Sequence, residues 1–321
     1  MEIYGTLGPA CAQGAILEQM FRCGMTGLRL NLSHTSLEES APLLEQMHLA
    51  AERCGVRPQL LIDLQGPELR VGKQGLPLLL EEGVRLPLRR LALPEHLYAA
   101  LQPETELLLD DGRLCVRVLP AGEGLVLRGG TLAPGKSVAV PGLCAALPAL
   151  TAADRKNLSL ASAFGVTGVM QSFVRSREDV EEVRTALCGT GLRHFAKLEN
   201  RAGLDSLEQW IRLPDVLVIA RGDLGNAVPL WELPGVQKRV AARARQAGKP
   251  FLVVTQMLAS MERTAVPTRA EVSDIFNAVL DGASALMLTG ETAAGRYPAE
   301  AMDYFCRTIR AAEAFLREGR S

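Results

Sequence analysis

Residues 216–228 read VLVIARGDLGNAV and join a buried-strand pattern directly to charged residues and glycines. The apolar, mostly β-branched start predicts a short strand buried on both faces, as in a parallel sheet. Arg221, Gly222 and Asp223 follow this strand at once, where a hydrophobic strand would be expected simply to turn away. In barrels of parallel strands, functional residues gather where the strands end. The stretch therefore predicts a parallel strand whose end carries a functional site.

Further short apolar runs resemble this strand, and each precedes a segment of helical periodicity. The predicted strands are 3–7, 28–32, 59–63, 168–172, 194–199, 215–220, 250–256 and 284–289. The predicted helices include 36–54, 176–188, 237–248 and a last helix that opens at Pro298, where proline fits the first turn. Parallel strands joined by helical crossovers predict the α/β class, and this number of units predicts a closed (β/α)8 TIM barrel.

A different pattern interrupts the alternation after the third strand. Residues 71–141 are rich in Gly, Pro and Leu and contain short β-like runs. These runs are 106–110, 114–119 and 125–129. The Asp-Asp-Gly at 110–112 is a hairpin-turn signal between the first two. We therefore expect a small all-β lid domain at 71–141, inserted into a barrel formed by 1–70 and 142–321.

Composition limits the possible partners and locations. The formal net charge of −1 offers no basic field for nucleic acid or an anionic membrane. No apolar run approaches the ~18 residues that span a bilayer, and the N-terminus lacks a signal-peptide pattern. The seven cysteines show no CxxC or metal-ligand spacing, which favours reduced thiols. We expect a cytoplasmic protein that binds neither nucleic acid nor membranes.

Polar side chains recur at the predicted strand ends. On the second strand, Arg29, Asn31 and Ser33 alternate with leucines and therefore share one face. Polar side chains inside a barrel are costly unless they line the mouth of a site. Other strand ends contribute Asp63, Lys197, Glu199, Arg221, Gly222, Asp223, Thr255, Gln256, Thr289, Gly290 and Glu291. A single such residue is often an ion pair or a helix cap, but several that converge on one rim predict a site.

The residue types at this rim restrict the reaction. Glu199 and Asp223 are carboxylates on adjacent strands, which suits a Mg²⁺ that keeps positions open for water and substrate. Lys197 and Arg29 are cations suited to phosphate or carboxylate oxygens, and Gly222 lets the backbone approach an anion. No Ser-His-Asp, Cys-His or His-rich zinc set is apparent. A metal and fixed cations without a nucleophile predict phosphoryl transfer.

The sequence resembles the pyruvate kinase family along nearly its whole length. The matching stretches are TLGPA (6–10), GMTGLRLNLSHTS (24–36), DLQGPELRVG (63–72), SFVRSREDV (172–180), KLENRAGLDSLEQW (197–210), VIARGDLG (218–225), AGKPFLVVTQMLASM (247–261) and PTRAEVSDIFNAVLDGASALMLTGETAAGRYP (267–298). The resemblance implies a (β/α)8 barrel with a lid after its third strand. It also implies the glycolytic transfer of a phosphoryl group from phosphoenolpyruvate to ADP, with Mg²⁺ or Mn²⁺ and usually K⁺.

The resemblance further implies which residues hold the cations. Glu199 and Asp223 match the ligands of the divalent metal. The positions that match the K⁺ ligands are Asn31, Ser33, Asp63 and, through its carbonyl, Leu64. Glu68 stands where a glutamate accompanies K⁺ dependence in the family.

Substrate-binding and catalytic roles are implied in the same way. Lys197 matches the lysine that stabilises the transferring phosphoryl group, and Arg29 matches the phosphate-binding arginine. The backbone amides of Gly222 and Asp223, together with Thr255, match the site of the enolpyruvate carboxylate. Thr255 also lies on the side where the enol is protonated. The residues that match the ATP- and ADP-binding positions are His34, Arg70 and Lys136.

Several positions depart from the family pattern. Leu64 and Gln65 replace the usual Thr-Lys, and Ala294 stands where a lysine is common. Asn226-Ala227 replaces the usual Val-Glu, and Ala139 replaces an asparagine. The predicted lid is also shorter than the family's. The chain ends at LREGRS without the family's C-terminal regulatory domain, so we expect no effector site of that type and, at most, a homo-oligomer of undetermined size.

Three functions remain open from the sequence. The first is a pyruvate kinase without the regulatory domain. The second is a related metal-dependent enolate enzyme, either aldolase-like or lyase-like or a kinase with another acceptor, and the changes at Leu64, Gln65 and Ala294 favour it. The third is a non-catalytic metabolite-binding homologue, against which the intact metal and phosphoryl residues argue.

Overall fold

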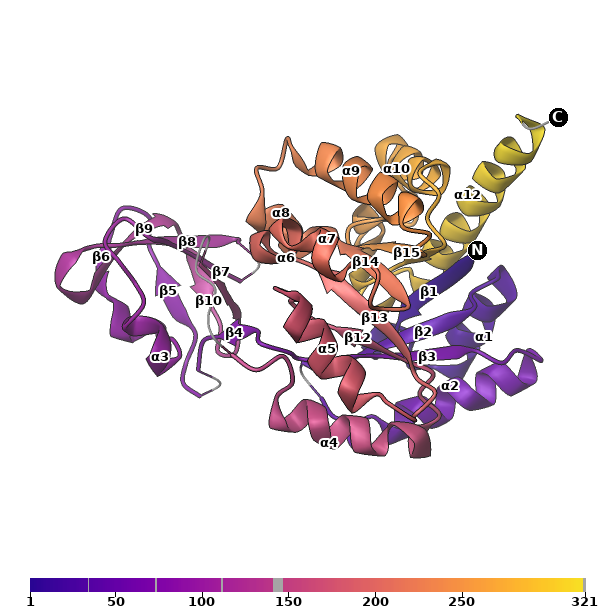
Figure 1. Cartoon of the computed structure of the whole chain (residues 1–321), viewed down its shortest axis with the longest axis horizontal. Coiled ribbons are helices and arrows are strands. Elements are labelled where there is room, and N and C mark those ends of the chain that lie inside the picture. The colour runs from indigo at the N-terminus through magenta and orange to yellow at the C-terminus, as the bar shows by residue number, and fades with distance from the viewer. Residues whose placement is uncertain (34, 73, 111, 141–146, 320–321) are drawn as a thin grey trace.

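The apolar runs predicted as strands form one closed barrel. The computed structural model describes residues 1–33, 35–72, 74–110, 112–140 and 147–319. Around the barrel the parallel strands follow the order β1-β16-β15-β14-β13-β12-β3-β2. Their bounds are β1 (Glu2–Thr6), β2 (Gly27–Asn31), β3 (Gln59–Asp63), β12 (Gly168–Gln171), β13 (Arg193–Leu198), β14 (Val216–Ala220), β15 (Phe251–Val254) and β16 (Ala285–Met287). The predicted (β/α)8 fold class is confirmed (Figure 1).

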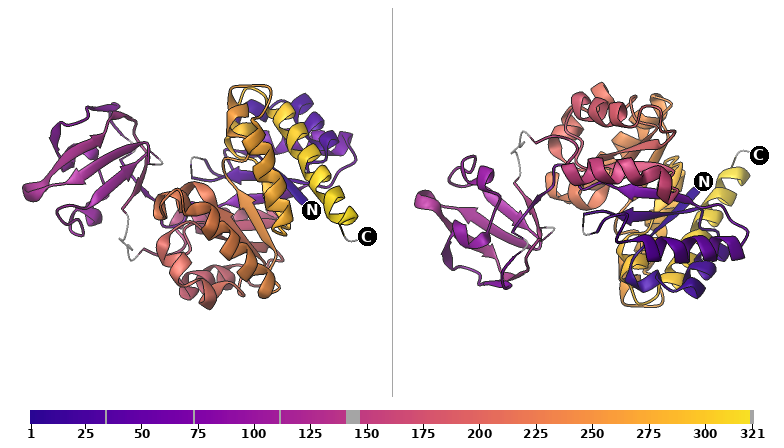
Figure 2. Two further views of the ribbon diagram at one scale, coloured as in Figure 1. Left: turned by 90° about the horizontal axis from the view of Figure 1, so that it is seen from above. Right: turned by 90° about the horizontal axis from the view of Figure 1, so that it is seen from below.

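Helices surround the barrel and cover the outward faces of its strands (Figures 1 and 2). The longer ones are α1 (Gly14–Cys23), α2 (Ala41–Arg53), α4 (Ala152–Leu160), α5 (Arg177–Ala186), α9 (Leu233–Gln246), α10 (Arg269–Leu280) and α12 (Pro298–Glu318). Short helices at the rim are α6 (Arg201–Asp205), α7 (Leu207–Trp210), α8 (Arg221–Ala227) and α11 (Gly290–Ala293). The 3-10 turns are η1 (Pro9–Cys11), η2 (Leu88–Leu91), η3 (Pro120–Gly122), η4 (Ala161–Phe164) and η5 (Ala259–Glu262). The last helix opens at Pro298, as predicted.

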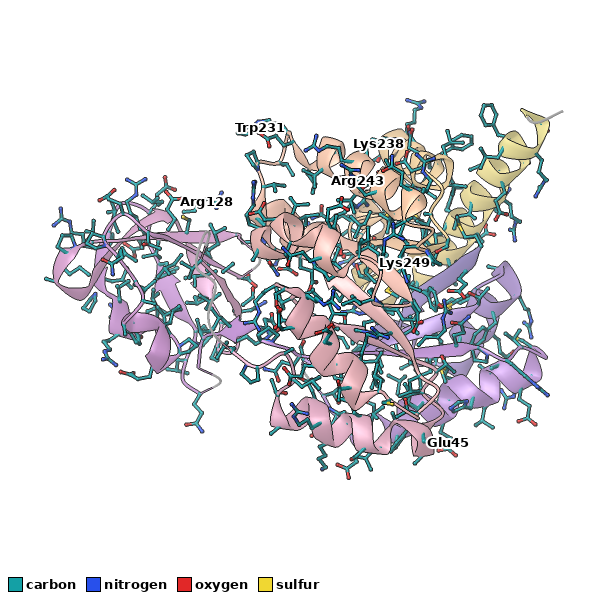
Figure 3. All side chains as sticks on the ribbon, in the orientation of Figure 1. Glu45, Arg128, Trp231, Lys238, Arg243 and Lys249 are labelled. Atoms are coloured by element: carbon teal, nitrogen blue, oxygen red, sulfur yellow. The ribbon has the colours of Figure 1, made fainter. Side chains whose placement is uncertain are left out.

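The two faces of each strand bury different residues. Leu28 and Leu30 of β2 point outward into the core beneath the helices, whereas Phe195 of β13 and Tyr4 of β1 fill the barrel interior. On the outside of the helices the side chains are charged and paired. In α9, for example, Lys238 and Arg243 lie on the surface in Figure 3, and they pair with Asp281 and Glu208 at 2.7 and 3.2 Å.

The insertion after β3 forms separate antiparallel sheets. Its strands are β4 (Leu69–Arg70), β5 (Leu78–Leu80), β6 (Arg85–Pro87), β7 (Glu106–Leu109), β8 (Leu114–Val118), β9 (Glu123–Arg128), β10 (Gly130–Leu132) and β11 (Ser137–Ala139), with a short helix α3 (Glu95–Tyr98). The predicted hairpin at 110–112 joins β7 to β8, although Asp111 lies outside the described residues. These elements bury their own apolar core and project from one end of the barrel (Figures 1 and 2). The exact limits of the two domains stay a prediction. In the structure the larger lid sheet already includes β4, which begins at Leu69.

Several predicted boundaries are wrong by a few residues. The strand predicted at 250–256 ends at Val254, because Thr255 and Gln256 adopt left-handed backbone angles with φ of 82° and 55°. The last barrel strand likewise ends at Met287, before the predicted 289. The helix predicted from 36 begins only at Ala41, with a proline in its first turn.

Among the helices of the described residues, none has the length and apolar character that crossing a membrane requires.

Candidate active site

Two cations and two carboxylates lie together at the carboxyl ends of the barrel strands. The ammonium of Lys197, on β13, lies 3.2 Å from Asp63 Oδ2 and 2.9 Å from Glu199 Oε1. Arg29, on β2, donates to the same oxygen of Asp63 at 2.7 Å. The side chains of Asp63 and Glu199 are only 2% and 1% exposed. The barrel therefore holds a buried charge network at this end.

The network fixes the charge of its members. Burial by itself raises the pKa of Asp63, but the adjacent Lys197 and Arg29 outweigh burial and hold this pKa below its usual value. Burial likewise disfavours the ammonium of Lys197, yet Asp63 and Glu199 raise its pKa above the ordinary value. Lys197 is thus a permanent cation, suited to stabilising anionic charge and unsuited to donating a proton.

Ser172 belongs to this network and is not among the site residues predicted from the sequence. It follows β12 directly, and its Oγ lies 3.0 Å from Asp63 Oδ1 and 2.7 Å from the carbonyl oxygen of Leu64. Lys197 donates to the same hydroxyl at 3.2 Å. The signal was available, because Ser172 is the polar residue that ends the predicted strand 168–172. A rule that examined every strand end would have found it.

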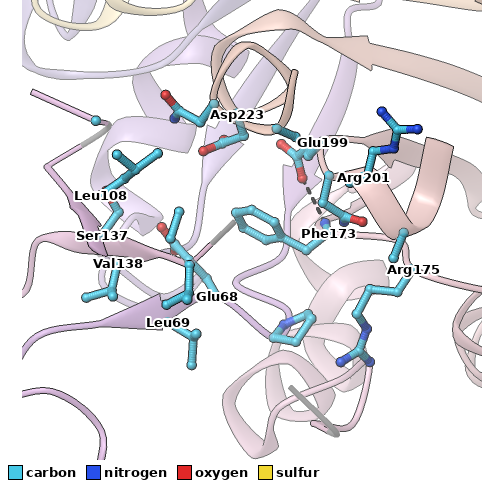
Figure 4. A pocket seen from close by; sticks show the side chains of 18 of the residues that line it. Glu68, Leu69, Leu108, Ser137, Val138, Phe173, Arg175, Glu199, Arg201 and Asp223 are labelled. Atoms are coloured by element: carbon cyan, nitrogen blue, oxygen red, sulfur yellow. Dashed lines mark hydrogen bonds between the residues drawn. The ribbon is translucent and has the colours of Figure 1, made fainter. Parts of the chain in front are cut away.

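Glu199 and Asp223 both line a cavity of about 420 Å³ between the barrel rim and the lid. Figure 4 shows their carboxylates on the same side of this cavity, facing lid residues such as Leu108 and Val138. The backbone N–H of Phe173 donates to Glu199 Oε2 at 2.7 Å and orients that carboxylate. Within the described ranges no three His, Cys, Asp or Glu residues gather as a metal cluster. Two carboxylates are nevertheless the donor set that suits a Mg²⁺ sharing its other positions with substrate and water.

The loop after β14 brings Gly222 against Thr255. The strand passes directly into α8, so Arg221, Gly222 and Asp223 form the first turn of that helix. A Cβ on Gly222 would lie 2.9 Å from Thr255 Cγ2, so a side chain there would displace Thr255. Arg221 donates to the carbonyl of Thr255 at 2.8 Å and pairs with Asp274 at 2.6 Å. Arg221 therefore braces the loop and holds the left-handed turn at Thr255.

The residues predicted to bind K⁺ lie at the ends of two neighbouring strands. Asn31 of β2 is paired in register with Asp63 of β3. The Oδ1 atom of Asn31 accepts a hydrogen bond from the backbone N–H of Ser33 at 3.1 Å. The carbonyl of Leu64 lies beside Ser172. All of these donors are oxygens, the atoms that bind alkali cations in proteins.

Arg70 and Lys136, two of the residues predicted on the nucleotide side, have acidic partners. Arg70 pairs with Glu68 at 2.8 Å and donates to the carbonyl of Gly135 at 2.8 Å. Lys136 pairs with Asp110 at 2.7 Å. Burial raises the pKa of Glu68, and the charge of Arg70 opposes this only in part. Neither Arg70 nor Lys136 lines the cavity that holds Glu199 and Asp223, and His34 lies outside the described residues.

Glu291 has a structural place at the rim. Its buried carboxylate accepts from the backbone N–H groups of Leu258 at 3.0 Å and Thr289 at 2.7 Å. It therefore ties the end of β16 to the loop after β15, and it does not join the charge network around Lys197.

These features define a class of protein, a (β/α)8 barrel under a β-sheet lid with fixed cations and metal-type carboxylates at its rim. A family model described as "Pyruvate kinase, barrel domain" matches residues 1–87 and 91–302. The chain belongs to the pyruvate kinase family.

Individual relatives show the extent of the similarity. A pyruvate kinase of Methylorubrum extorquens is 40% identical over 317 residues, which cover 94% of this chain and 66% of the relative. Pyruvate kinases of Aeropyrum pernix and Mycobacterium tuberculosis are each 38% identical, with 96% and 97% of this chain matched to 69% and 70% of theirs. The chain thus spans about two thirds of the length of these relatives. None of these names favours the aldolase-like or non-catalytic alternatives.

Proposed function

We propose that this chain transfers the phosphoryl group of phosphoenolpyruvate to ADP and so forms pyruvate and ATP. The observation that carries the proposal is the buried network of Lys197, Arg29, Asp63 and Glu199 beside the cavity, in a chain of this family. Phosphoryl transfer needs positioning and charge stabilisation more than covalent help, and this network offers both.

In the reaction, the bond between phosphorus and the enol oxygen breaks as a terminal oxygen of ADP bonds to the same phosphorus. Lys197 stabilises the negative charge of the transferring group, and its raised pKa keeps it charged throughout. Arg29 binds the same group from the neighbouring strand. A divalent cation held by Glu199 and Asp223 would supply Lewis-acid stabilisation of the phosphoryl and enolate oxygens.

The enolpyruvate half of the substrate is held at the loop that contains Gly222 and Asp223. The backbone amides of Gly222 and Asp223 and the hydroxyl of Thr255 bind its carboxylate. The close approach of the Gly222 loop to the Thr255 side chain supports this placement. Carbon 3 of the enolate then takes up a proton on the Thr255 side and yields pyruvate.

K⁺ and the nucleotide complete the proposal. Asn31, Ser33, Asp63 and the carbonyl of Leu64 bind K⁺, and Glu68 accounts for a dependence on it. The lid-side cations Arg70 and Lys136, with His34, bind the phosphates of ADP. Since both lid-side cations are paired with carboxylates, the phosphates of the nucleotide would have to replace Glu68 and Asp110 as their partners.

A cytoplasmic location, a place in glycolysis and a homo-oligomeric state belong to the same proposal. The cysteines in the described part of the chain are all free thiols, which agrees with a reducing compartment.

The test is pyruvate release from phosphoenolpyruvate and ADP in the presence of Mg²⁺ and K⁺, followed through a coupled dehydrogenase. We expect release that requires both ADP and the divalent metal. Other nucleoside diphosphates, offered in parallel, measure the choice of acceptor. Absence of release with every acceptor, from a protein that still binds phosphoenolpyruvate and metal, would contradict the proposal.

A further inference from the structure

A buried aspartate outside the charge network is tied to the end of β3. Asp154 is 1% exposed and occupies the third position of α4, the first helix after the lid. It forms a capping box with Thr151, whose Oγ1 accepts from Asp154 N at 3.0 Å and whose N–H donates back to Asp154 Oδ2 at 2.9 Å. A capping box satisfies the free N–H groups at the start of a helix. The sequence by itself would give Asp154 only this capping role.

The same carboxylate also reaches across to the loop that follows β3. The backbone N–H of Gln65 donates to Asp154 Oδ1 at 2.9 Å, and that of Gly66 donates to Oδ2 at 3.0 Å. Gly66 has a φ of 61°, so the two successive N–H groups turn toward one point. Consecutive N–H groups of this kind form an anion-binding concavity, and here the anion is a side chain of the chain itself.

The opposite side of this loop is held as firmly. The hydroxyl of Ser172 lies 2.7 Å from the carbonyl oxygen of Leu64, whose N–H donates to Met170 at 3.0 Å. A Cβ on Gly66 would lie 3.0 Å from the carbonyl of Ser172, so the loop and the end of β12 are in close contact. The peptide groups from Leu64 to Gly66 are therefore clamped between Asp154 on one side and Ser172 on the other.

We propose that Asp154 is a positioning residue for the monovalent cation. By holding the N–H groups of Gln65 and Gly66, it fixes the direction of the Leu64 carbonyl, which shares a planar peptide group with the N–H of Gln65. Residues that orient ligands in this way typically change metal affinity about 10- to 100-fold when they are removed. The inference rests on the K⁺ site of the proposed function, and Asp154 itself touches neither cation nor substrate.

The chain offers a matched control for the capping role. Thr151→Ala removes the hydroxyl of the capping box but leaves the carboxylate free to accept from Gln65 and Gly66. Asp154→Ala removes both the cap and the clamp, whereas Asp154→Asn keeps one acceptor oxygen and should behave between the two. A purely structural role for Asp154 would give Thr151→Ala and Asp154→Ala the same functional profile.

The experiment measures the response of the protein to K⁺ in two independent ways. One is the K⁺ concentration for half-maximal pyruvate release, with choline keeping the ionic strength constant. The other is the rise in Tm caused by K⁺ without substrates. We expect Asp154→Ala to raise the half-activating K⁺ concentration about tenfold or more and to weaken the Tm response. The half-saturating Mg²⁺ concentration should change less than about twofold. Thr151→Ala should lower Tm and leave both K⁺ responses as in the wild type.

The possible results separate this inference from the proposed function. Equal K⁺ responses in Asp154→Ala and Thr151→Ala would overturn the positioning role. A wild type that releases pyruvate but shows neither K⁺ response would overturn it too, while leaving phosphoryl transfer intact. A K⁺ effect on Tm that depends on Asp154, in a protein that releases no pyruvate, would support the inference and contradict the proposed activity. If Asp154→Ala does not fold, Asp154→Asn decides between these results.

Discussion

The two ends of the barrel are both closed by polar networks, and one strand contributes to each. On the inward face of β13, Arg193 lies at the amino end and Lys197 at the carboxyl end, with Phe195 between them. At the amino end, Arg193 donates to Glu2 Oε1 at 2.8 Å and to Gln59 Oε1 at 2.9 Å. The phenol of Tyr4 donates to Gln59 at 2.6 Å. Each end is thus hydrogen-bonded, but the partners differ in kind.

Exposure and charge separate the two ends. Arg193 and Glu2 keep 37% and 30% of their side chains exposed, and a neutral amide and a phenol share the remaining bonds. At the other end Lys197 is 11% exposed, and its partners are carboxylates buried almost completely. Buried ion pairs give little net stability because desolvation costs about as much as the pairing returns. A partly exposed network such as the one at the amino end is enough to close a barrel. The buried charges at the carboxyl end therefore indicate function.

The largest expected effect is the loss of turnover in Lys197→Met. The variant removes the fixed cation that we propose stabilises the transferring phosphoryl group, and a loss of about 10³-fold in kcat is expected. Mg²⁺ binding should survive, because Glu199 and Asp223 remain. The coupled pyruvate assay and a Mg²⁺ titration by calorimetry measure the two quantities. Turnover close to that of the wild type would remove the role given to Lys197.

The residue between the two networks should matter for stability. Phe195 is fully buried and packs edge-on against Tyr4, with ring centroids 6.4 Å apart. Phe195→Ala leaves a cavity inside the barrel and should lower the free energy of unfolding by about 3–5 kcal/mol. Urea denaturation measures this loss. A loss below about 1 kcal/mol would mean that the interior collapses around the smaller side chain.

The outward face of the same strand predicts a pH effect. His194 is buried, with Nε2 2.8 Å from Gln171 Oε1 and Nδ1 without a partner in the described structure. Burial lowers its pKa to about 4, and the nearby Asp215 opposes this only in part. The unfolded chain takes up a proton near pH 6.5 and the folded chain does not, so stability should fall as the pH falls from 6.5 towards 4.

The size of that loss is at most about 3.5 kcal/mol, from about 1.4 kcal/mol for each unit between the ordinary pKa of 6.5 and the folded pKa of about 4. His194→Gln removes the titrating group and should flatten the dependence in this range. Unfolding free energies at pH 7 and pH 4.5, for the wild type and the variant, measure it. An unchanged pH dependence in His194→Gln would assign the effect to other groups.

The smallest effect is expected at the amino end. Arg193→Met breaks hydrogen bonds to Glu2 and Gln59 in a half-exposed network, and a loss of about 1 kcal/mol is expected. Turnover should stay within about twofold of the wild type, because the site lies at the opposite end of the barrel. This variant is the counterpart of Lys197→Met on the same strand. A large loss of kcat in both would show that the two ends are coupled through Phe195.

The outline of this structure is contained in local patterns of the sequence. Short apolar runs alternate with helical periodicity, and the period along each run assigns its inward residues. For that reason Arg29, Asp63, Lys197 and Glu199 were predicted at one rim, and they do lie together there. The hairpin signal at 110–112 was equally local, and it does join β7 to β8.

Contacts between distant segments were decided only by the tertiary structure. The sequence contains a capping box at Thr151 and Asp154, but not the reach of that carboxylate to Gln65 and Gly66. It likewise contains no sign that Arg70 donates to the carbonyl of Gly135. A periodic pattern specifies which face of an element is buried, whereas hydrogen-bond partners depend on which loops the closed barrel brings to the same rim.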